Sequence, residues 1–188
     1  PDHANANYNL GIILNDLGKL KEAELSYRKA IEIQPDFADA HSNLGNVLKD
    51  LGKSQEAELS YHKALELNPD LAEAYYNLGN IFQEKGNFYD AIKLYKQALK
   101  LNNELSLAKS GLIFTKRTIC DWSDEGTHDI WLKSIGIKGE SISPWEFFSL
   151  EDNPLKHLKR SKKFYKEKHS RPSKQIKFSK KNIIHIGY

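Results

Sequence analysis

Three asparagines recur at a fixed interval of 34 residues in this chain. Asn9, Asn43 and Asn77 each stand directly before a Leu-Gly pair. Asparagine forms helices less readily than alanine, by roughly 0.7 kcal/mol, so its repetition inside helical patterns calls for a reason. A carboxamide offers both a hydrogen-bond donor and an acceptor, which is what a peptide unit needs from a partner. The spacing therefore favours a row of amides that holds an extended peptide backbone.

Further polar residues fall on the same helix face as these asparagines. On a helix, the positions four earlier and three later are neighbours of a given residue. Asp39 and Glu73 stand four positions before the second and third asparagine, where they would add side-chain preference to backbone binding. Tyr8 and Tyr76, each directly before an asparagine of the row, would add to this preference. The residues predicted to bind a peptide are Asn5, Asn9, Asp39, Asn43, Asn46, Glu73, Asn77 and Asn80. A second interpretation stays open, in which the amides bond to one another or to adjacent helix ends and only stabilise the stack.

The elements that must position these residues are pairs of helices that occur three times. The units span residues 1–34, 35–68 and 69–102, and a glycine turn divides each unit into two helical patterns. A period of this length indicates a solenoid of helical hairpins. Small residues leave room for the two helices to approach, and large residues fill the remaining gaps. The small residues are Gly11, Gly45, Gly79, Ala23, Ala57 and Ala91, and the large ones are Leu10, Leu44, Leu78, Tyr27, Tyr61 and Tyr95.

The order Leu-Gly, alanine, aromatic, alanine and proline at these offsets resembles the tetratricopeptide repeat (TPR) family. The resemblance covers residues 1–102, in which the pattern occurs three times in phase. It implies an all-α fold, a right-handed superhelix whose first helices line the concave side. By this resemblance the asparagine row would face an extended peptide or a protein substrate.

The sequence after the repeats has a different pattern. Residues 103–119 keep a helical period and predict a capping helix over the last hairpin. Residues 120–181 predict an aromatic and then basic linker, partly helical and partly irregular. Residues 182–188 read "NIIHIGY", which predicts one terminal β-strand, the first of a catalytic domain that lies outside this sequence.

Several residues of the linker carry structural expectations. The pair Asn153-Pro154 predicts the start of a helix that runs to about Lys168. Trp122 is one of several aromatic residues for which we expect burial. Cys120 is the only cysteine, so it cannot form an internal disulfide, and we expect it to be a small buried hydrophobe.

A narrower resemblance follows from the junction after the repeats. The motifs Cys120-Asp121-Trp122, Ser143-Pro144 and Ile186-Gly187-Tyr188, after repeats rich in Asn-Leu-Gly, are similar to those of protein O-linked N-acetylglucosamine transferases. In that family the repeats present protein substrates to a glycosyltransferase domain that uses a UDP-sugar, UDP-GlcNAc. The resemblance implies that the parent protein is such an enzyme, whereas this segment has no catalytic residues and no cofactor of its own.

The same resemblance gives roles to the repeated polar residues. The family's asparagine ladder, which grips the substrate backbone, matches Asn9, Asn43 and Asn77, and its substrate-contacting aspartates match Asp39. Asn5 and Glu73 stand where the family has aspartate, so preference for substrate side chains would differ there.

The charge is divided unevenly along the chain. Residues 151–188 contain 12 Lys and Arg against 3 Asp and Glu, a net charge of +9, whereas residues 1–150 carry 16 against 22, which gives −6. A basic run with aromatics could bind nucleic acid, but such runs are more often a solvated helix face and a linker, so we do not expect nucleic acid as a partner.

The sequence gives little indication of a membrane protein, a secreted protein or a metal-binding protein. No apolar run is long enough to cross a membrane, no leader is visible, and no histidine pair has metal-ligand spacing, so we expect a cytoplasmic protein without a metal. Methionine is absent, and Pro1-Asp2 repeats the pairs that open later units, which predicts a segment of a longer repeat array. The competing hypothesis is a non-enzymatic adaptor that binds other proteins. The sequence does not indicate an oligomeric state.

Overall fold

A computed structural model describes residues 2–133, 135, 137 and 154–168. These residues form three helical hairpins followed by three further helices. The hairpins are α1 (Asp2–Asp16) with α2 (Leu20–Ile33), α3 (Ala38–Asp50) with α4 (Ser54–Leu67), and α5 (Ala72–Glu84) with α6 (Phe88–Leu101). The further helices are α7 (Ser106–Thr118), α8 (Glu125–Leu132) and α9 (Pro154–Lys168).

The predicted all-α class is confirmed for the described residues, which contain helices and no strand. The β-strand predicted for residues 182–188 lies outside them. Helix α9 begins at Pro154 and ends at Lys168, as the Asn-Pro pair predicted. In the part of the chain that the structure describes, no helix has the length and apolar character needed to cross a membrane.

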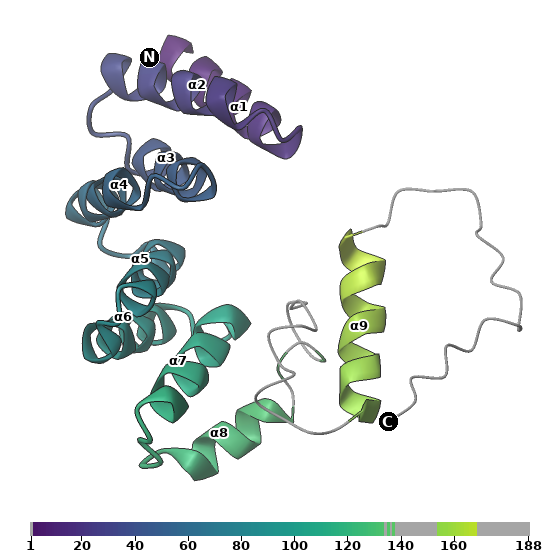
Figure 1. The fold of residues 1–188 in the computed structure, drawn as a ribbon. Coiled ribbons are helices and arrows are strands. Elements are labelled where there is room, and N and C mark those ends of the chain that lie inside the picture. Colours follow the sequence, from purple (N-terminus) through teal and green to yellow (C-terminus); the bar gives the residue numbers. More distant parts are fainter. Residues whose placement is uncertain (1, 134, 136, 138–153, 169–188) are drawn as a thin grey trace, which may run out of the picture.

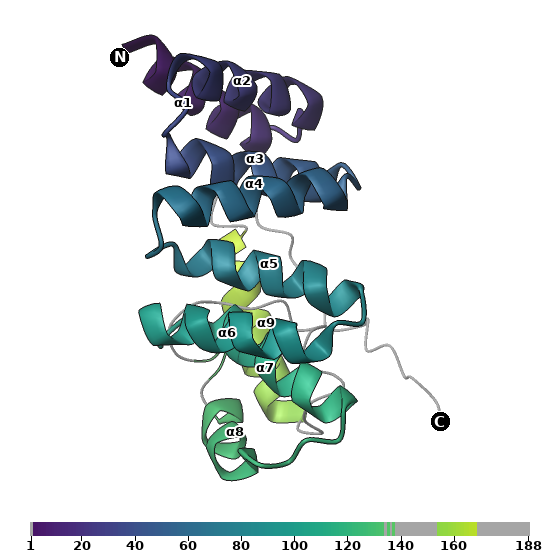
Figure 2. The same cartoon turned by 90° about the vertical axis from the view of Figure 1, so that its left-hand side faces the viewer.

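The hairpins stack side by side into an arc. The first helix of each hairpin lies on the inner side of the arc and the second on the outer side, and α7 continues the inner row after α5 (Figure 1). Figure 2, seen from the outer side, shows the hairpins as successive layers from α1–α2 down to α5–α6. Neighbouring layers pack through α2 on α3, α4 on α5 and α6 on α7. The inner row therefore presents the face that carries the predicted amides.

Each hairpin closes by packing a glycine against a tyrosine ring. A Cβ placed on Gly45 would lie 2.7 Å from Cε1 of Tyr61, closer than real Cβ atoms approach. Gly11 meets Tyr27 and Gly79 meets Tyr95 in the same way. These rings are at most 2% exposed. The small residues that the sequence predicted to permit close approach are thus required by the aromatic ring on the other helix.

Leu10 departs from the prediction that it fills a gap in the core. Its counterparts Leu44 and Leu78 are 5% and 1% exposed, whereas Leu10 is 47% exposed. The difference arises because α2 covers α3 and α4 covers α5. No helix among the described residues takes that place against α1.

The passage from α7 to α8 contradicts two expectations. Cys120 is exposed, with a φ angle of 57°, because the chain turns there at the end of α7. Its N–H and that of Asp121 donate to carbonyls of the last turn of α7, at 3.1 Å and 2.8 Å. Trp122 is 51% exposed, and its ring lies 5.9 Å from the Arg117 guanidinium rather than in a core. Both predictions of burial were wrong because this turn lies at the surface.

A buried lysine ties α7 to the start of α8. The Lys116 side chain is 2% exposed, and its Nζ lies 2.6 Å from Asp124 Oδ2 and 3.1 Å from Asp121 Oδ2. Burial lowers the Lys116 pKa, but hydrogen bonds to the two aspartates outweigh burial and raise it. Beyond this cluster, Ile113 of α7 packs with Leu132 and Ile135.

Arg160 attaches α9 to the end of α8. It lies within the basic run, yet it is fully buried. Its Nε donates to the Ile135 carbonyl at 2.9 Å, and its second guanidinium nitrogen donates to the Leu132 carbonyl at 2.6 Å. A helix leaves its last carbonyls without partners, and a cation there also favours the helix dipole.

Candidate functional site

Amides from neighbouring hairpins form a continuous hydrogen-bonded row on the inner face. Asn43 donates its Nδ2 to the Tyr8 hydroxyl at 3.1 Å. Asn46 donates to Asn43 Oδ1 at 3.5 Å, and Asn77 donates to Asn46 Oδ1 at 2.9 Å. The row thus links α1, α3 and α5. The hydrogen bonds between amides that the second interpretation assumed are therefore present at Asn43, Asn46 and Asn77.

Buried tyrosines support this row from behind. The Tyr61 hydroxyl donates to Asn46 Oδ1 at 2.7 Å. Burial raises the Tyr61 pKa, with smaller contributions from nearby groups, so the hydroxyl keeps its proton and remains a donor. Burial also raises the Tyr8 pKa, and the charge of Asp39 adds to this. The ring that packs on Gly45 therefore also fixes the amide of Asn46.

In the third hairpin, a buried tyrosine likewise contacts an asparagine side chain. The Tyr95 hydroxyl lies 2.8 Å from Asn80 Oδ1 and 2.7 Å from Gln83 Oε1. Its pKa is raised by burial, as for Tyr61. Two polar atoms on neighbouring turns of α5 make no hydrogen bond within the described residues: Oδ1 of Asn77 and Nδ2 of Asn80. One is an acceptor and the other a donor.

The remaining predicted residues lie around this row. Asn5 and Asn9 are exposed on α1, and neither takes part in the hydrogen-bonded row. Asp39 and Glu73 are also exposed, and with Asn43 they line a cavity of about 540 Å³. The wall of this cavity further includes Tyr8, Ser42, Asp70, Leu71, Ala72, Ala74, Leu101 and Asn102. The structure therefore places acidic side chains beside the amide row, with no Lys or Arg in this cavity.

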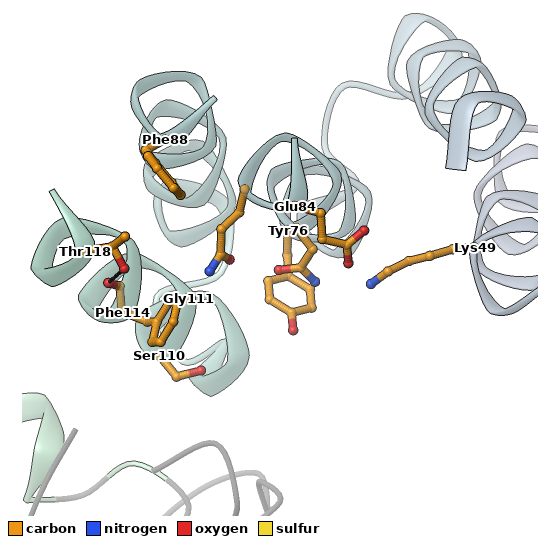
Figure 3. Close-up of a pocket in the computed structure, with 10 residues that line it drawn as sticks. Lys49, Tyr76, Glu84, Phe88, Ser110, Gly111, Phe114 and Thr118 are labelled. Atoms are coloured by element: carbon orange, nitrogen blue, oxygen red, sulfur yellow. Dashed lines mark hydrogen bonds between the residues drawn. The ribbon is translucent and has the colours of Figure 1, made fainter. Parts of the chain in front are cut away.

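A second cavity of about 610 Å³ lies farther along the inner face. Figure 3 shows Tyr76 of α5 and Phe114 of α7 on either side of it, with Phe88 of α6 nearby. Its other residues are Lys49, Asn80, Gln83, Glu84, Ser110, Gly111 and Thr118. Of the residues around this cavity, the sequence identified Asn80 as a predicted peptide contact and Tyr76 as a neighbour that adds side-chain preference. The sequence signal that was missed is the 34-residue register, which continues into α7. In this register, Gly111 occupies the position of Asn77 and Phe114 the position of Asn80.

The described residues contain no group of three or more His, Cys, Asp or Glu that could hold a metal ion. The polar side chains that line the two cavities carry amides, hydroxyls, carboxylates and the Lys49 ammonium group. Such groups hold and orient a ligand by hydrogen bonds and charge.

Family models match the repeated part of the chain in phase. A model described as TPR repeat matches residues 11–52 and again 45–86, and one described as tetratricopeptide repeat matches residues 72–104. Together these matches extend over residues 11–104, half of the sequence. The chain belongs to the tetratricopeptide repeat family. The resemblance stated from the sequence is confirmed at this level.

Solved structures show the same fold. The first TPR domain of Spaghetti (RPAP3), bound to the HSP90 peptide SRMEEVD, has a TM-score of 0.61 at 23% identity, and the match covers 63% of this chain and 94% of that one. The TPR domain of Arabidopsis OM64 has a TM-score of 0.61 at 19% identity, over 62% of this chain and 97% of that one. PilF of Pseudomonas aeruginosa has a TM-score of 0.62 at 22% identity, over 89% and 70%. Likeness at such identities concerns the fold alone, and the sequence has no match among curated proteins.

Proposed function

We propose that this TPR chain is a peptide-binding module that holds an extended segment of a partner protein along its inner face. The observation that carries the proposal is the pair of open amide atoms on α5. Asn77 offers an acceptor and Asn80 a donor, and both side chains are already fixed by hydrogen bonds to Asn46 and Tyr95. Such a pair complements the N–H and C=O of a peptide backbone and does not depend on the peptide's side chains.

The internal hydrogen bonds of the row refine the ladder hypothesis. Asn43 and Asn46 bond to each other and to tyrosines, so their first contribution is to fix the inner face. In the proposal, Asn77 and Asn80 contact the peptide directly, whereas Asn43 and Asn46 position Asn77. Asn5 and Asn9 remain proposed contacts for a chain that extends toward α1. The TPR domain solved with an HSP90 peptide supports the proposal as an example of this fold with a bound peptide.

The acidic side chains beside the row predict the charge of the peptide that binds there. Asp39, Asp70 and Glu73 line one cavity without a cation among them. A basic peptide would meet a favourable field on this face and an acidic peptide such as SRMEEVD an unfavourable one. We therefore expect the partner segment to be neutral or basic.

The test uses fluorescently labelled peptides of about twelve residues, long enough to extend over the four inner helices α1, α3, α5 and α7 at roughly 10 Å each. Asn77→Ala with Asn80→Ala removes two hydrogen bonds of about 1 kcal/mol each, so affinity should fall roughly thirtyfold for several unrelated sequences alike. The control is Asn7→Ala, because Asn7 donates to the His3 carbonyl within α1 and lies outside the row. Equal affinity of the double variant and the wild type would refute backbone binding by these amides.

The origin of the module in a glycosyltransferase stays a proposal that rests on sequence resemblance. Asp121 and Trp122 of the first junction motif lie at the turn after α7, and the motifs at residues 143–144 and 186–188 lie outside the described residues. In this proposal the natural protein transfers GlcNAc from UDP-GlcNAc to proteins held by the repeats. Incubation of the natural full-length protein with labelled UDP-GlcNAc and acceptor proteins tests it. Absence of transfer would favour the adaptor, in which the same peptide-binding face serves assembly.

A further inference from the structure

The polar row on the inner face ends at α7, where its chemistry changes. In the 34-residue register, Gly111 takes the position of Asn77 and Phe114 takes that of Asn80. Helix α7 nevertheless packs against α6 and contacts α5, as an inner helix of a following hairpin would. The inner face therefore continues past the last amide, but an aromatic surface replaces the polar one.

Gly111 keeps this surface hollow. A Cβ at this position would lie 2.9 Å from Cζ of Tyr95, the ring that also packs on Gly79. Since that ring is fully buried, it has no space into which to retreat. Glycine is thus required by the core behind it, and the missing side chain leaves the floor of the 610 Å³ cavity open.

The walls of the cavity are aromatic and remain accessible. Phe114 is 42% exposed, although phenylalanine is among the most costly residues to leave in water. Tyr76 and Phe88 are only partly buried on the other side. A cavity of roughly 150 Å³ with apolar walls is enough for benzene, so this one has room for an aromatic side chain and part of its backbone.

The rim of the cavity is continuous with the amide row. Asn80 lines the cavity and follows Asn77, the last amide of the row, by three positions on α5. Figure 3 shows Lys49 of α3 and Glu84 of α5 extending toward each other at the side of the cavity away from α7. An extended chain advances about 3.3 Å per residue and neighbouring hairpins lie about 8–10 Å apart, so a side chain two or three residues beyond the peptide unit at Asn80 would reach α7.

We propose that this cavity is a specificity pocket that takes one large apolar side chain, best an aromatic one, from the bound peptide. The proposal rests on the peptide-binding function proposed above and adds sequence preference to it. The amides of α5 would hold the backbone, and the pocket formed by Tyr76, Phe88 and Phe114 would select the residue that follows. Ring stacking against these walls favours aromatic over aliphatic occupants.

The experiment combines a small probe with a peptide series. The probe is N-acetyl-phenylalaninamide, titrated while the backbone amide signals of the protein are followed by NMR. The peptides share one background of alanine and serine, and a single phenylalanine is moved through its positions. In wild type the probe should shift the Gly111 signal, and the best phenylalanine peptide should bind about tenfold more tightly than the all-alanine background.

Two variants distinguish binding in the pocket from nonspecific hydrophobic binding elsewhere on the surface. Phe114→Ala removes an exposed wall and should reduce the tenfold preference to about twofold while leaving the alanine peptide unchanged. Tyr89→Ala is the matched control, because Tyr89 is an aromatic residue of α6 that is 74% exposed and lies outside the cavity. The control should keep the full preference. Thermal melting of both variants checks that the fold is retained.

The outcomes distinguish the pocket from the function on which it rests. Binding of all peptides without preference for phenylalanine would overturn the pocket and leave backbone binding in place. A Gly111 shift by the probe without binding of any peptide would overturn the peptide function and leave an aromatic-ligand site. Neither a shift nor peptide binding would overturn both. Preference that survives Phe114→Ala would also overturn the assignment of the pocket.

Discussion

Replacement of Gly45 by alanine tests the packing that fixes both the fold and the amide row. The added Cβ would lie 2.7, 2.8 and 2.9 Å from three atoms of the Tyr61 ring. Tyr61 is fully buried, and its hydroxyl donates to Asn46 at 2.7 Å. The ring therefore cannot move away without opening its own packing and lengthening that hydrogen bond.

The magnitude follows from three terms. Overpacking of a filled core costs about 1–3 kcal/mol. Loss of the Tyr61–Asn46 hydrogen bond costs about 1 kcal/mol, and the gain in helix propensity from glycine to alanine returns about 1 kcal/mol. We expect Gly45→Ala to lower the free energy of unfolding by about 2 kcal/mol, which corresponds to a fall in Tm of roughly 4–8 °C for a chain of this size.

Thermal and urea unfolding followed by circular dichroism measures this difference. Gly126→Ala is the matched control, because Gly126 lies in α8 and an added Cβ there meets nothing within 4 Å. The control should be as stable as wild type or more stable by up to about 1 kcal/mol, from propensity alone. If Gly45→Ala matched Gly126→Ala, the close approach of helix and ring would be refuted as the reason for the repeated glycines.

Two further predictions concern the part after the repeats. Hydrogen bonds from Ser123 and then Lys116 hold the pKa of Asp121 at about 2, below its ordinary value of 3.8, so its stabilising contribution is present above about pH 4 and lost as the pH falls toward 2. Wild type should lose more Tm over that interval than Asp121→Asn; parallel Tm profiles would exclude the contribution. Arg160→Met leaves the carbonyls of Leu132 and Ile135 without their donor, at about 1–3 kcal/mol each. Amide hydrogen exchange should speed up in α9 and not in α1–α6, whereas Lys159→Met, an exposed neighbour, should change neither.

Much of the repeat fold could be predicted from the sequence. The period of 34 residues, the paired glycines and tyrosines, and the asparagines on one helix face follow from helical geometry, since 3.6 residues per turn decide which residues share a face. The Asn-Pro pair gave the start of α9 at Pro154, because proline suits the first turn of a helix. Helical geometry left the function of the asparagines open, because the period gives the direction of a side chain and not the groups that it contacts.

The tertiary structure decided what each of those side chains meets. Asn46 accepts from Tyr61, 15 positions away, because α3 and α4 close into one hairpin, and from Asn77, 31 positions away, because neighbouring hairpins stack. The exposed Cys120, the buried Arg160 and the aromatic cavity beside Gly111 likewise depend on how α7, α8 and α9 meet. The 34-residue register of the repeats reaches α7 but does not place α8 or α9. The sequence by itself determined the faces of the helices, and contacts between helices determined which groups remain open to a ligand.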